Sequence, residues 1–214
     1  MRIKVVTDET FRDHQGYDLF DPQKVTFEEE VNVNKADRLH DVLYRLSEKF
    51  KCNGIYLRIW PIKQRGNNSF RPSFLDTSGI WHEKIFEVAD RKDPWIVYVE
   101  KPKFGIWGMS LGSFDRASQR LLFLKYYDPA QEIIQYMGHI CISLYHYIFC
   151  QNSSILMEIM VERASLSKGT KLLVYEEVGP NHIKPSSSRI NQDGNILIYQ
   201  VDSYRLRERN CPYR

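Results

Sequence analysis

The residues that could do chemistry in this 214-residue chain are four cysteines and six histidines. A cysteine protease needs a thiolate, a histidine base beside it, and an Asn or Asp that orients the histidine. His139 and Cys141 are two positions apart in a strand-like stretch, so their side chains are expected on the same face. Strand neighbours of this kind are more often packing residues than a nucleophile and its base. The sequence therefore predicts no catalytic site.

The same residues do not form a metal-binding pattern. The cysteines form no C-x2-C pair, and the histidines are scattered, so we expect reduced thiols, no metal and no cofactor. The net charge of +3 is small and the basic residues are interspersed, which argues against direct binding to nucleic acid. No apolar run approaches the roughly 20 residues that cross a bilayer, so we expect no membrane segment. The cysteines are Cys52, Cys141, Cys150 and Cys211.

The second half of the chain reads as two strands, a helix and two further strands. An apolar and aromatic run from Leu121 ends at Asp128-Pro129, a turn signal, and a second strand follows it as a hairpin. The predicted elements are strands Leu121–Asp128 and Ile133–Ser143, helix Ser153–Leu166, and strands Lys171–Val178 and Asn195–Val201. The helix carries a core-facing apolar stripe.

The first half repeats this order. Its helix has apolar residues at helical spacing from Leu39 to Phe50, with Asn34 as the expected N-cap, Asp37 in the first turn and Asn53-Gly54 at the end. Phe11–Asp18 is polar and contains a glycine, which predicts a loop. The other predicted elements are strands Arg2–Asp8, Val25–Val31, Ile55–Trp60 and Trp95–Glu100, a short extended piece at Arg71–Asp76, and a helical turn at Glu83–Val88.

The connection Lys101–Ser118 contains three glycines and a proline, a composition typical of a linker. It also contains six large apolar residues, among them Phe104, Trp107 and Phe114, that are costly to leave in water. We expect this linker to be partly docked on a neighbouring domain. The alternative is an aromatic binding patch around Trp107 and Phe104.

One amphipathic helix crossing a mixed sheet is an α+β arrangement, and periodicity alone leaves the β-grasp, ferredoxin-like and other α+β folds open. Over nearly its whole length, however, the chain resembles the first two ubiquitin-like domains in the C-terminal region of the herpesvirus-associated ubiquitin-specific proteases. The matching motifs are His14-Gln15-Gly16, Asp18, Asp21, Arg58-Ile59-Trp60-Pro61, Arg71-Pro72, Leu75-Asp76 and Pro94-Trp95 in the first domain, and Leu122–Lys125, Tyr127-Asp128-Pro129, Gly138-His139-Ile140, Tyr175–Val178 and Asp193-Gly194 in the second.

The resemblance implies two tandem ubiquitin-like β-grasp domains. We place the first at 1–100, a partly docked linker at 101–118, the second at 119–203 and a C-terminal tail at 204–214. It also implies a nuclear and cytoplasmic protein whose parent is a thiol-dependent deubiquitinase with its catalytic domain upstream. The cysteine and histidine boxes of that protease family have no counterpart in this sequence.

The resemblance further implies an acidic surface on the second domain that takes up lysine-bearing peptides. Of the paired acids there, Asp193 is kept and the second is replaced by Asn195; Glu176 and Glu177 supply charge nearby if their turn folds toward Asp193. The simpler interpretation of Asp193-Gly194 is a tight turn. If the surface binds, Asp193→Ala should weaken a lysine-bearing peptide and Asn195→Asp should strengthen it.

Three functions follow from these patterns. The first is recruitment of substrates or regulators with basic or lysine-bearing segments to a deubiquitinase, alongside the catalytic domain of the parent chain. The second is a structural spacer that positions the catalytic domain relative to further C-terminal domains. The third, a small stand-alone enzyme, is disfavoured because no catalytic constellation is present.

Overall fold

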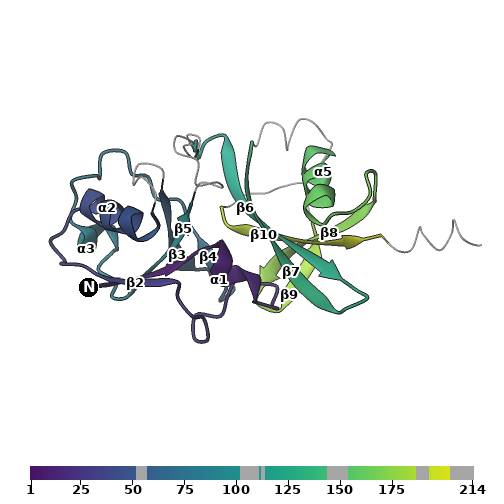
Figure 1. Cartoon of the computed structure of the whole chain (residues 1–214), viewed down its shortest axis with the longest axis horizontal. Coiled ribbons are helices and arrows are strands. Elements are labelled where there is room, and N and C mark those ends of the chain that lie inside the picture. Colours follow the sequence, from purple (N-terminus) through teal and green to yellow (C-terminus); the bar gives the residue numbers. More distant parts are fainter. Residues whose placement is uncertain (52–56, 102–110, 112–113, 144–153, 187–192, 203–214) are drawn as a thin grey trace, which may run out of the picture. The chain divides into compact units, whose positions relative to one another are not determined.

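The computed structural model describes residues 1–51, 57–101, 111, 114–143, 154–186 and 193–202 (Figure 1). These residues divide into two compact units. Unit 1 consists of described residues within Met1–Phe11, Phe20–Arg65 and Phe70–Arg116. Unit 2 consists of Arg12–Leu19, Gly66–Ser69 and the described residues from Ala117 onward. Two short segments from the first half of the sequence therefore belong to the second unit, and the domain boundaries stated above stay a prediction.

The predicted repeat of one fold is confirmed by the strand order. The first sheet has the order β2-β1-β5-β3-β4 and the second the order β7-β6-β10-β8-β9, and in both the first and last strands of the unit are parallel neighbours. The first half contains β1 (Arg2–Val6), α1 (Asp8–Arg12), β2 (Glu29–Asn32), α2 (Leu39–Lys49), β3 (Arg58–Gln64), β4 (Phe70–Pro72), α3 (Ile85–Val88) and β5 (Trp95–Glu100).

The second half contains β6 (Gln119–Asp128), β7 (Ile133–Ser143), α5 (Ser154–Arg163), β8 (Leu172–Gly179), β9 (His182–Pro185) and β10 (Asn195–Val201). These strand orders, with one longer helix packed on each sheet, are the β-grasp architecture of ubiquitin. The α+β prediction and the choice of β-grasp among its alternatives are confirmed.

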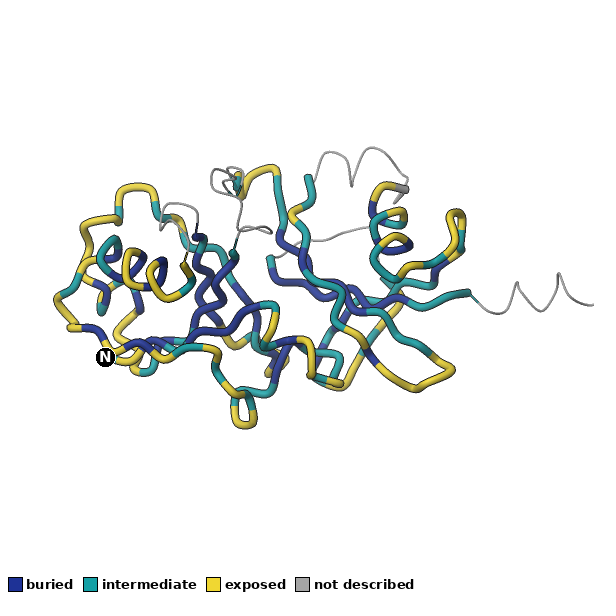
Figure 2. Tube along the Cα trace, in the orientation of Figure 1, coloured by how far each residue is buried: buried dark blue, intermediate teal, exposed yellow. Residues whose placement is uncertain are grey.

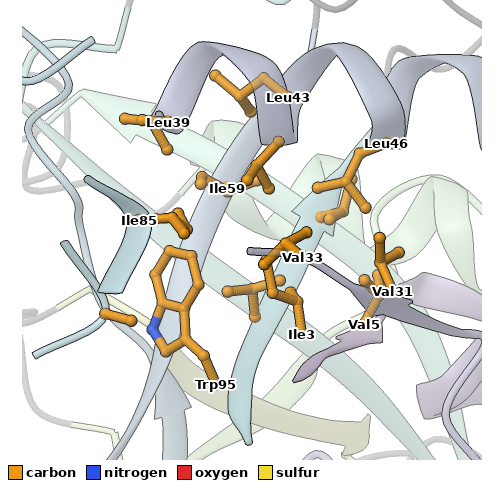
Figure 3. Packing of buried hydrophobic residues seen from close by; sticks show 14 of the residues in the cluster. Ile3, Val5, Val31, Val33, Leu39, Leu43, Leu46, Ile59, Ile85 and Trp95 are labelled. Carbon is orange, nitrogen blue, oxygen red and sulfur yellow. The ribbon is translucent and has the colours of Figure 1, made fainter. Parts of the chain in front are cut away.

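Each sheet buries one face against its helix. In unit 1, α2 packs Leu39, Leu43 and Leu46 on side chains of the sheet that include Ile3 and Ile59 (Figure 3). In unit 2, Leu156 and Met160 of α5 lie in one cluster with side chains of β6 and β10. The strands carry most of the buried residues of both units (Figure 2).

The start of α2 differs from the prediction. The helix begins at Leu39 after Arg38, and the Arg38 N–H donates to Asp41 Oδ2 at 3.0 Å. Asn34 instead holds a separate turn, where its Oδ1 accepts from Ala36 N at 3.0 Å. Both are favourable Asn and Asp turn geometries, and sequence alone does not rank them. Asn53-Gly54, the expected end of the helix, lies outside the described residues.

Two predicted strand boundaries were wrong for local reasons. The first strand ends at Val6, because Thr7 caps helix α1: its N–H donates to Thr10 Oγ1 at 3.0 Å and its Oγ1 accepts from Glu9 N. Strand β3 continues through Pro61 to Gln64 rather than ending there. The Pro61 carbonyl accepts from Ser73 N at 2.9 Å, so the side of Pro61 that lacks an N–H faces the short edge strand β4.

The predicted strand Val25–Val31 is shorter in the structure, where β2 covers Glu29–Asn32. The backbone N–H groups of Lys24 and Val25 both donate to Asp21 O, so a turn occupies the start of that stretch. Strand β9 was not predicted, since its sequence His182–Pro185 is short and has no alternating pattern. The predicted bounds of β7 and β10 match the structure.

Candidate partner-binding site

The residues predicted to bind partners lie where β8 and β10 run side by side (Figure 1). Leu197 pairs with Glu176 in the antiparallel register, so Asn195, two residues before Leu197, is on the same face as Glu176. The Asn195 side chain donates from Nδ2 to Glu176 Oε1 at 2.9 Å. The structure therefore brings these two residues together, as an amide hydrogen-bonded to a carboxylate.

A lysine of the chain itself completes this group. Lys184, on the neighbouring strand β9, pairs with Glu176 in the register, and its Nζ lies 3.8 Å from Glu176 Oε2. The lysine side chain is half exposed, whereas that of Glu176 is mostly covered. Sequence reasoning missed Lys184, because strand β9 that positions it was not predicted. One carboxylate thus holds an amide on one oxygen and an ammonium near the other.

Asp193 has a structural role at the turn into β10. Its Oδ1 accepts a hydrogen bond from the Leu121 N–H at 3.3 Å, and the next residue, Gly194, donates its N–H to the Leu121 carbonyl at 2.8 Å. Gly194 has a φ of +75°, a conformation that favours glycine. The turn interpretation of Asp193-Gly194 is therefore correct as a description of the backbone, and it leaves a partner-binding role of Asp193 as a prediction.

Glu177 does not join the group. It follows Glu176 in strand β8, so its side chain points to the opposite face of the sheet, and it is only 4% exposed. The expectation that both glutamates supply charge beside Asp193 fails for Glu177, because side chains alternate between faces along a strand. Glu176 alone places a carboxylate beside Asn195.

A loop from the first half of the sequence lies beside this end of β8. Asn67 donates from Nδ2 to the Val178 carbonyl at 2.5 Å, and its Oδ1 accepts from Ser69 N at 3.1 Å. The segment Gly66–Ser69 belongs to unit 2 for this reason. No sequence signal links positions 67 and 178, since the polar loop reads only as a hairpin connection.

The proposed secondary patch, Trp107 and Phe104, lies outside the described residues. Phe114, at the end of the same linker, is described and packs in unit 1. Its ring centroid lies 4.9 Å from that of Trp60 and 5.3 Å from that of Phe74. Phe114 thus contacts the aromatic side chains of unit 1, and the docking of the linker as a whole stays a prediction.

Comparison with known proteins identifies the family. A family described as the ICP0-binding domain of ubiquitin-specific protease 7 matches residues 57–212. The chain belongs to this family. Residues 57–212 include the six strands and helices described above for the second half. They also include every predicted site residue, with Phe104 and Trp107 of the linker among them.

The chain is also similar to ubiquitin carboxyl-terminal hydrolase 7 of Drosophila melanogaster. It is 26% identical to this chain over an alignment of 213 positions, which covers 94% of the chain and 18% of the relative. The chain thus spans about a fifth of the length of this relative. The resemblance to ubiquitin-specific proteases is confirmed.

The His139 and Cys141 pair is placed as the strand pattern predicted, on one face of β7. His139 is buried, with its ring centroid 6.2 Å from that of Phe123, whereas Cys141 is exposed. Within the described ranges, no group of three or more His, Cys, Asp or Glu side chains is arranged to hold a metal ion. No helix in the described part of the chain is long and apolar enough to cross a membrane.

Proposed function

We propose that this chain is a non-catalytic binding region of a cysteine-type deubiquitinase, and that it recruits protein partners through their basic, lysine-bearing segments. The family to which it belongs is described by its binding of ICP0, and the Drosophila relative is named as a ubiquitin carboxyl-terminal hydrolase. Partner binding is therefore the activity to seek in this region, and hydrolysis belongs to the rest of the parent chain.

The observation that carries the proposal is the ion pair between Glu176 and Lys184. This pair supports the proposal, because an ammonium group already lies 3.8 Å from the Glu176 carboxylate. At 3.8 Å and with Lys184 half exposed, the pair is a weak surface interaction, typically worth ~0–1 kcal/mol. A lysine from a partner can therefore replace Lys184 at little cost.

Recognition by side chains suits this unit better than addition of a partner strand. Of the two edge strands in the second sheet, β9 ends in Pro185, which has no N–H to offer. In β7 the carbonyls of Met137 and His139 already accept bonds from Arg163, each at 2.9 Å. Both edges are thus partly blocked for strand pairing.

The structure also refines the effect of Asn195→Asp. Asn195 is 6% exposed and its Nδ2 lies 2.9 Å from Glu176 Oε1, so an aspartate would place a second carboxylate against the first. Two carboxylates in such contact repel each other unless a cation lies between them. We expect Asn195→Asp to lower the stability of the free protein and to raise its affinity for a lysine-bearing peptide, since the peptide ammonium relieves the repulsion.

The test is isothermal titration of the whole chain with a short peptide that carries two lysines, at low and moderate salt. Glu176→Gln should weaken binding about tenfold, because a charge-assisted bond becomes a neutral one. Lys184→Ala should strengthen binding, because it removes the internal competitor. Glu158→Gln, an exposed acid on α5, is the matched control and should leave the affinity unchanged.

Opposite effects of Glu176→Gln and Lys184→Ala, both reduced by salt, support recruitment at this surface. Unchanged affinity in both variants would refute the acidic surface. If the peptide does not bind the unaltered chain at all, the spacer function is favoured instead.

A further inference from the structure

Lys125 of β6 is a fully buried lysine, at 0% exposed. Its Nζ donates to three backbone carbonyls, those of His14 at 3.2 Å, Gly16 at 2.7 Å and Asp18 at 2.6 Å. A carbonyl oxygen can only accept, and a lysine ammonium has three N–H donors. The three carbonyls therefore match the donors of one ammonium group, which offsets the high cost of burying its charge. We call them the carbonyl cage.

The loop Arg12–Leu19 is shaped to present this cage. The three carbonyls come from alternate residues, and the side chains at the two ends of the cage meet, with His14 Nε2 in contact with Asp18 Oδ1. Gly16 lies beneath that contact. A Cβ at position 16 would stand 2.6 Å from His14 Nε2 and 2.7 Å from Asp18 Oδ1, so only glycine fits without breaking the pair.

The loop has a second point of attachment on unit 2. The Ile134 N–H on β7 donates to the Gln15 side chain, with Oε1 at 3.1 Å. Four hydrogen bonds thus join the loop to the sheet, and the partners in each lie more than a hundred residues apart in sequence. These bonds explain why Arg12–Leu19 groups with unit 2.

The cage lies on the sheet face opposite α5. Leu122 and Leu124 face the helix cluster, so Leu121, Phe123 and Lys125 point the other way. Lys125 pairs with Ile198, and Phe123 with Ile196, in the parallel register of β6 and β10. All of these residues are buried, so this sheet has two covered faces, and the loop contributes to the second cover at its Lys125 end.

We propose that the loop Arg12–Leu19 covers this face of the second sheet in the place of a protein partner, and that the hydrogen bonds of Lys125 hold the loop there. While these hydrogen bonds are intact, the loop covers the face that carries Phe123 and Ile198, and protein partners cannot bind there. The cage recognises a primary ammonium by its shape and acceptors. Once the Lys125 side chain is removed, a small alkylammonium ion fits the vacated cage.

The first test follows amide hydrogen exchange in the whole chain by NMR. Lys125→Met keeps the length of the side chain and removes the ammonium. Exchange of the Ile134 amide, whose acceptor is Gln15 of the loop, should become at least about tenfold faster. The amide of Gly194, bonded to the Leu121 carbonyl, reports on the remaining fold and should stay unchanged. Unchanged exchange at Ile134 in a folded variant would overturn the proposal.

The second test uses chemical rescue. Lys125→Ala lacks the three outer carbons and the ammonium, which n-propylammonium supplies. Adding n-propylammonium chloride should restore slow exchange at Ile134, whereas 1-propanol and sodium chloride at equal concentration should not. Equal rescue by 1-propanol would show that the site recognises only apolar volume and would overturn the cage.

Gly16→Ala covers the case in which substitutions at Lys125 unfold the protein, since it alters the loop without touching the sheet. It should also speed exchange at Ile134, and the absence of such a change would contradict the proposal. Binding of an apolar dye tests whether the loop covers this face. It should at least double in Lys125→Met and in Gly16→Ala, in which the loop is released from the sheet. A faster Ile134 amide with no gain in dye binding would show that the loop does not cover the face.

Discussion

The two units share one strand order, but one buried charge in each, Glu100 and Lys125, is satisfied in a different way. In unit 1, Glu100 is buried and accepts from Arg58 Nη1 at 2.7 Å and from Trp60 Nε1 at 2.9 Å. Arg58 is the register partner of Glu100 on the adjacent strand, so this charge is satisfied by neighbouring side chains. In unit 2, the buried charge of Lys125 is satisfied by backbone carbonyls of a loop more than a hundred residues away.

This difference separates the features that both units share from those that each unit has alone. The strand order and the helix-facing core follow from a pattern present in both halves of the sequence. The polar groups that enter each core are individual to the unit, because each needs a partner at one position. Substitutions that remove these partners should therefore change the free energy of unfolding by different amounts in the two units.

The largest effect is expected for Glu100→Ala. It leaves the Trp60 N–H buried without this acceptor and Arg58 without its carboxylate, and breaking a buried charge pair typically costs about 3–5 kcal/mol. Urea unfolding of the whole chain measures the change. Glu87→Ala is the control, because its pair with Arg91 is exposed and should contribute less than ~1 kcal/mol. Similar losses for the two variants would contradict the role given to Glu100.

An intermediate effect is expected at a bulge in β7, where the register against β6 shifts between Phe123 and Lys125 and the extra residue lies at Met137-Gly138. The described strand pairs of unit 1 have no such shift. Gly138 has a φ of +90°, and an added Cβ would lie 3.2 Å from Arg163 Nη1, which donates to the Met137 carbonyl. Gly138→Ala therefore combines backbone strain of ~1–2 kcal/mol with disturbance of the Arg163 bonds.

Gly79→Ala provides the matched control in unit 1. Gly79 has a φ of +80°, and nothing lies within 4 Å of an added Cβ, so only the backbone strain remains. Thermal unfolding should show the larger loss for Gly138→Ala, by roughly 1 kcal/mol, the typical net value of a hydrogen bond. Equal losses would mean that the contact with Arg163 does not matter.

The smallest effects are expected for a pair of buried tyrosines, and they should have opposite signs. The Tyr98 hydroxyl in unit 1 donates to Asp8 Oδ1 at 3.1 Å. The Tyr199 hydroxyl in unit 2 is buried and has no hydrogen-bond partner within the described ranges. Tyr98→Phe should thus destabilise by ~1 kcal/mol, whereas Tyr199→Phe should stabilise by about as much, because it removes an unsatisfied polar group.

Alkaline unfolding sharpens the same comparison. Burial raises the pKa of Tyr199 well above its usual value of 10.0. Above about pH 10 the unfolded chain loses this proton and the folded chain keeps it, so the free energy of unfolding should fall as pH rises, by up to ~1.4 kcal/mol per pH unit. Tyr199→Phe should reduce this fall, measured by urea unfolding between pH 9 and 11. The same slope in both proteins would show that Tyr199 does not titrate in this way.

Much of the fold could be predicted because its signals are local. Strand β6 follows from the apolar run that ends at Asp128-Pro129, β10 from the run that begins after Asp193-Gly194, and α2 from its apolar spacing. The missed elements are those with weak or competing local signals. Strand β9 has four residues, and helix α1 begins at Asp8, within the alternating pattern of Arg2–Asp8 that predicts a strand.

The candidate site was only partly predictable for the same reason. The spacing of Asp193 and Asn195 is visible in the sequence, and so is the pair of glutamates in β8. Which glutamate faces Asn195 depends on the register of β8 against β10, since one position along a strand reverses the face. That register selects Glu176 and buries Glu177, and it also brings Lys184 of β9 beside Glu176.

By itself, the sequence determined the order of the longer strands and helices, the repeated plan of the two halves and the family, because these rest on periodicity and on motifs in sequence. Only the tertiary structure decided that Lys125 lies among the carbonyls of His14, Gly16 and Asp18, and that Asn67 reaches Val178. Hydrogen bonds between residues so far apart carry no periodic signal. They depend on where the folded chain places each donor and acceptor.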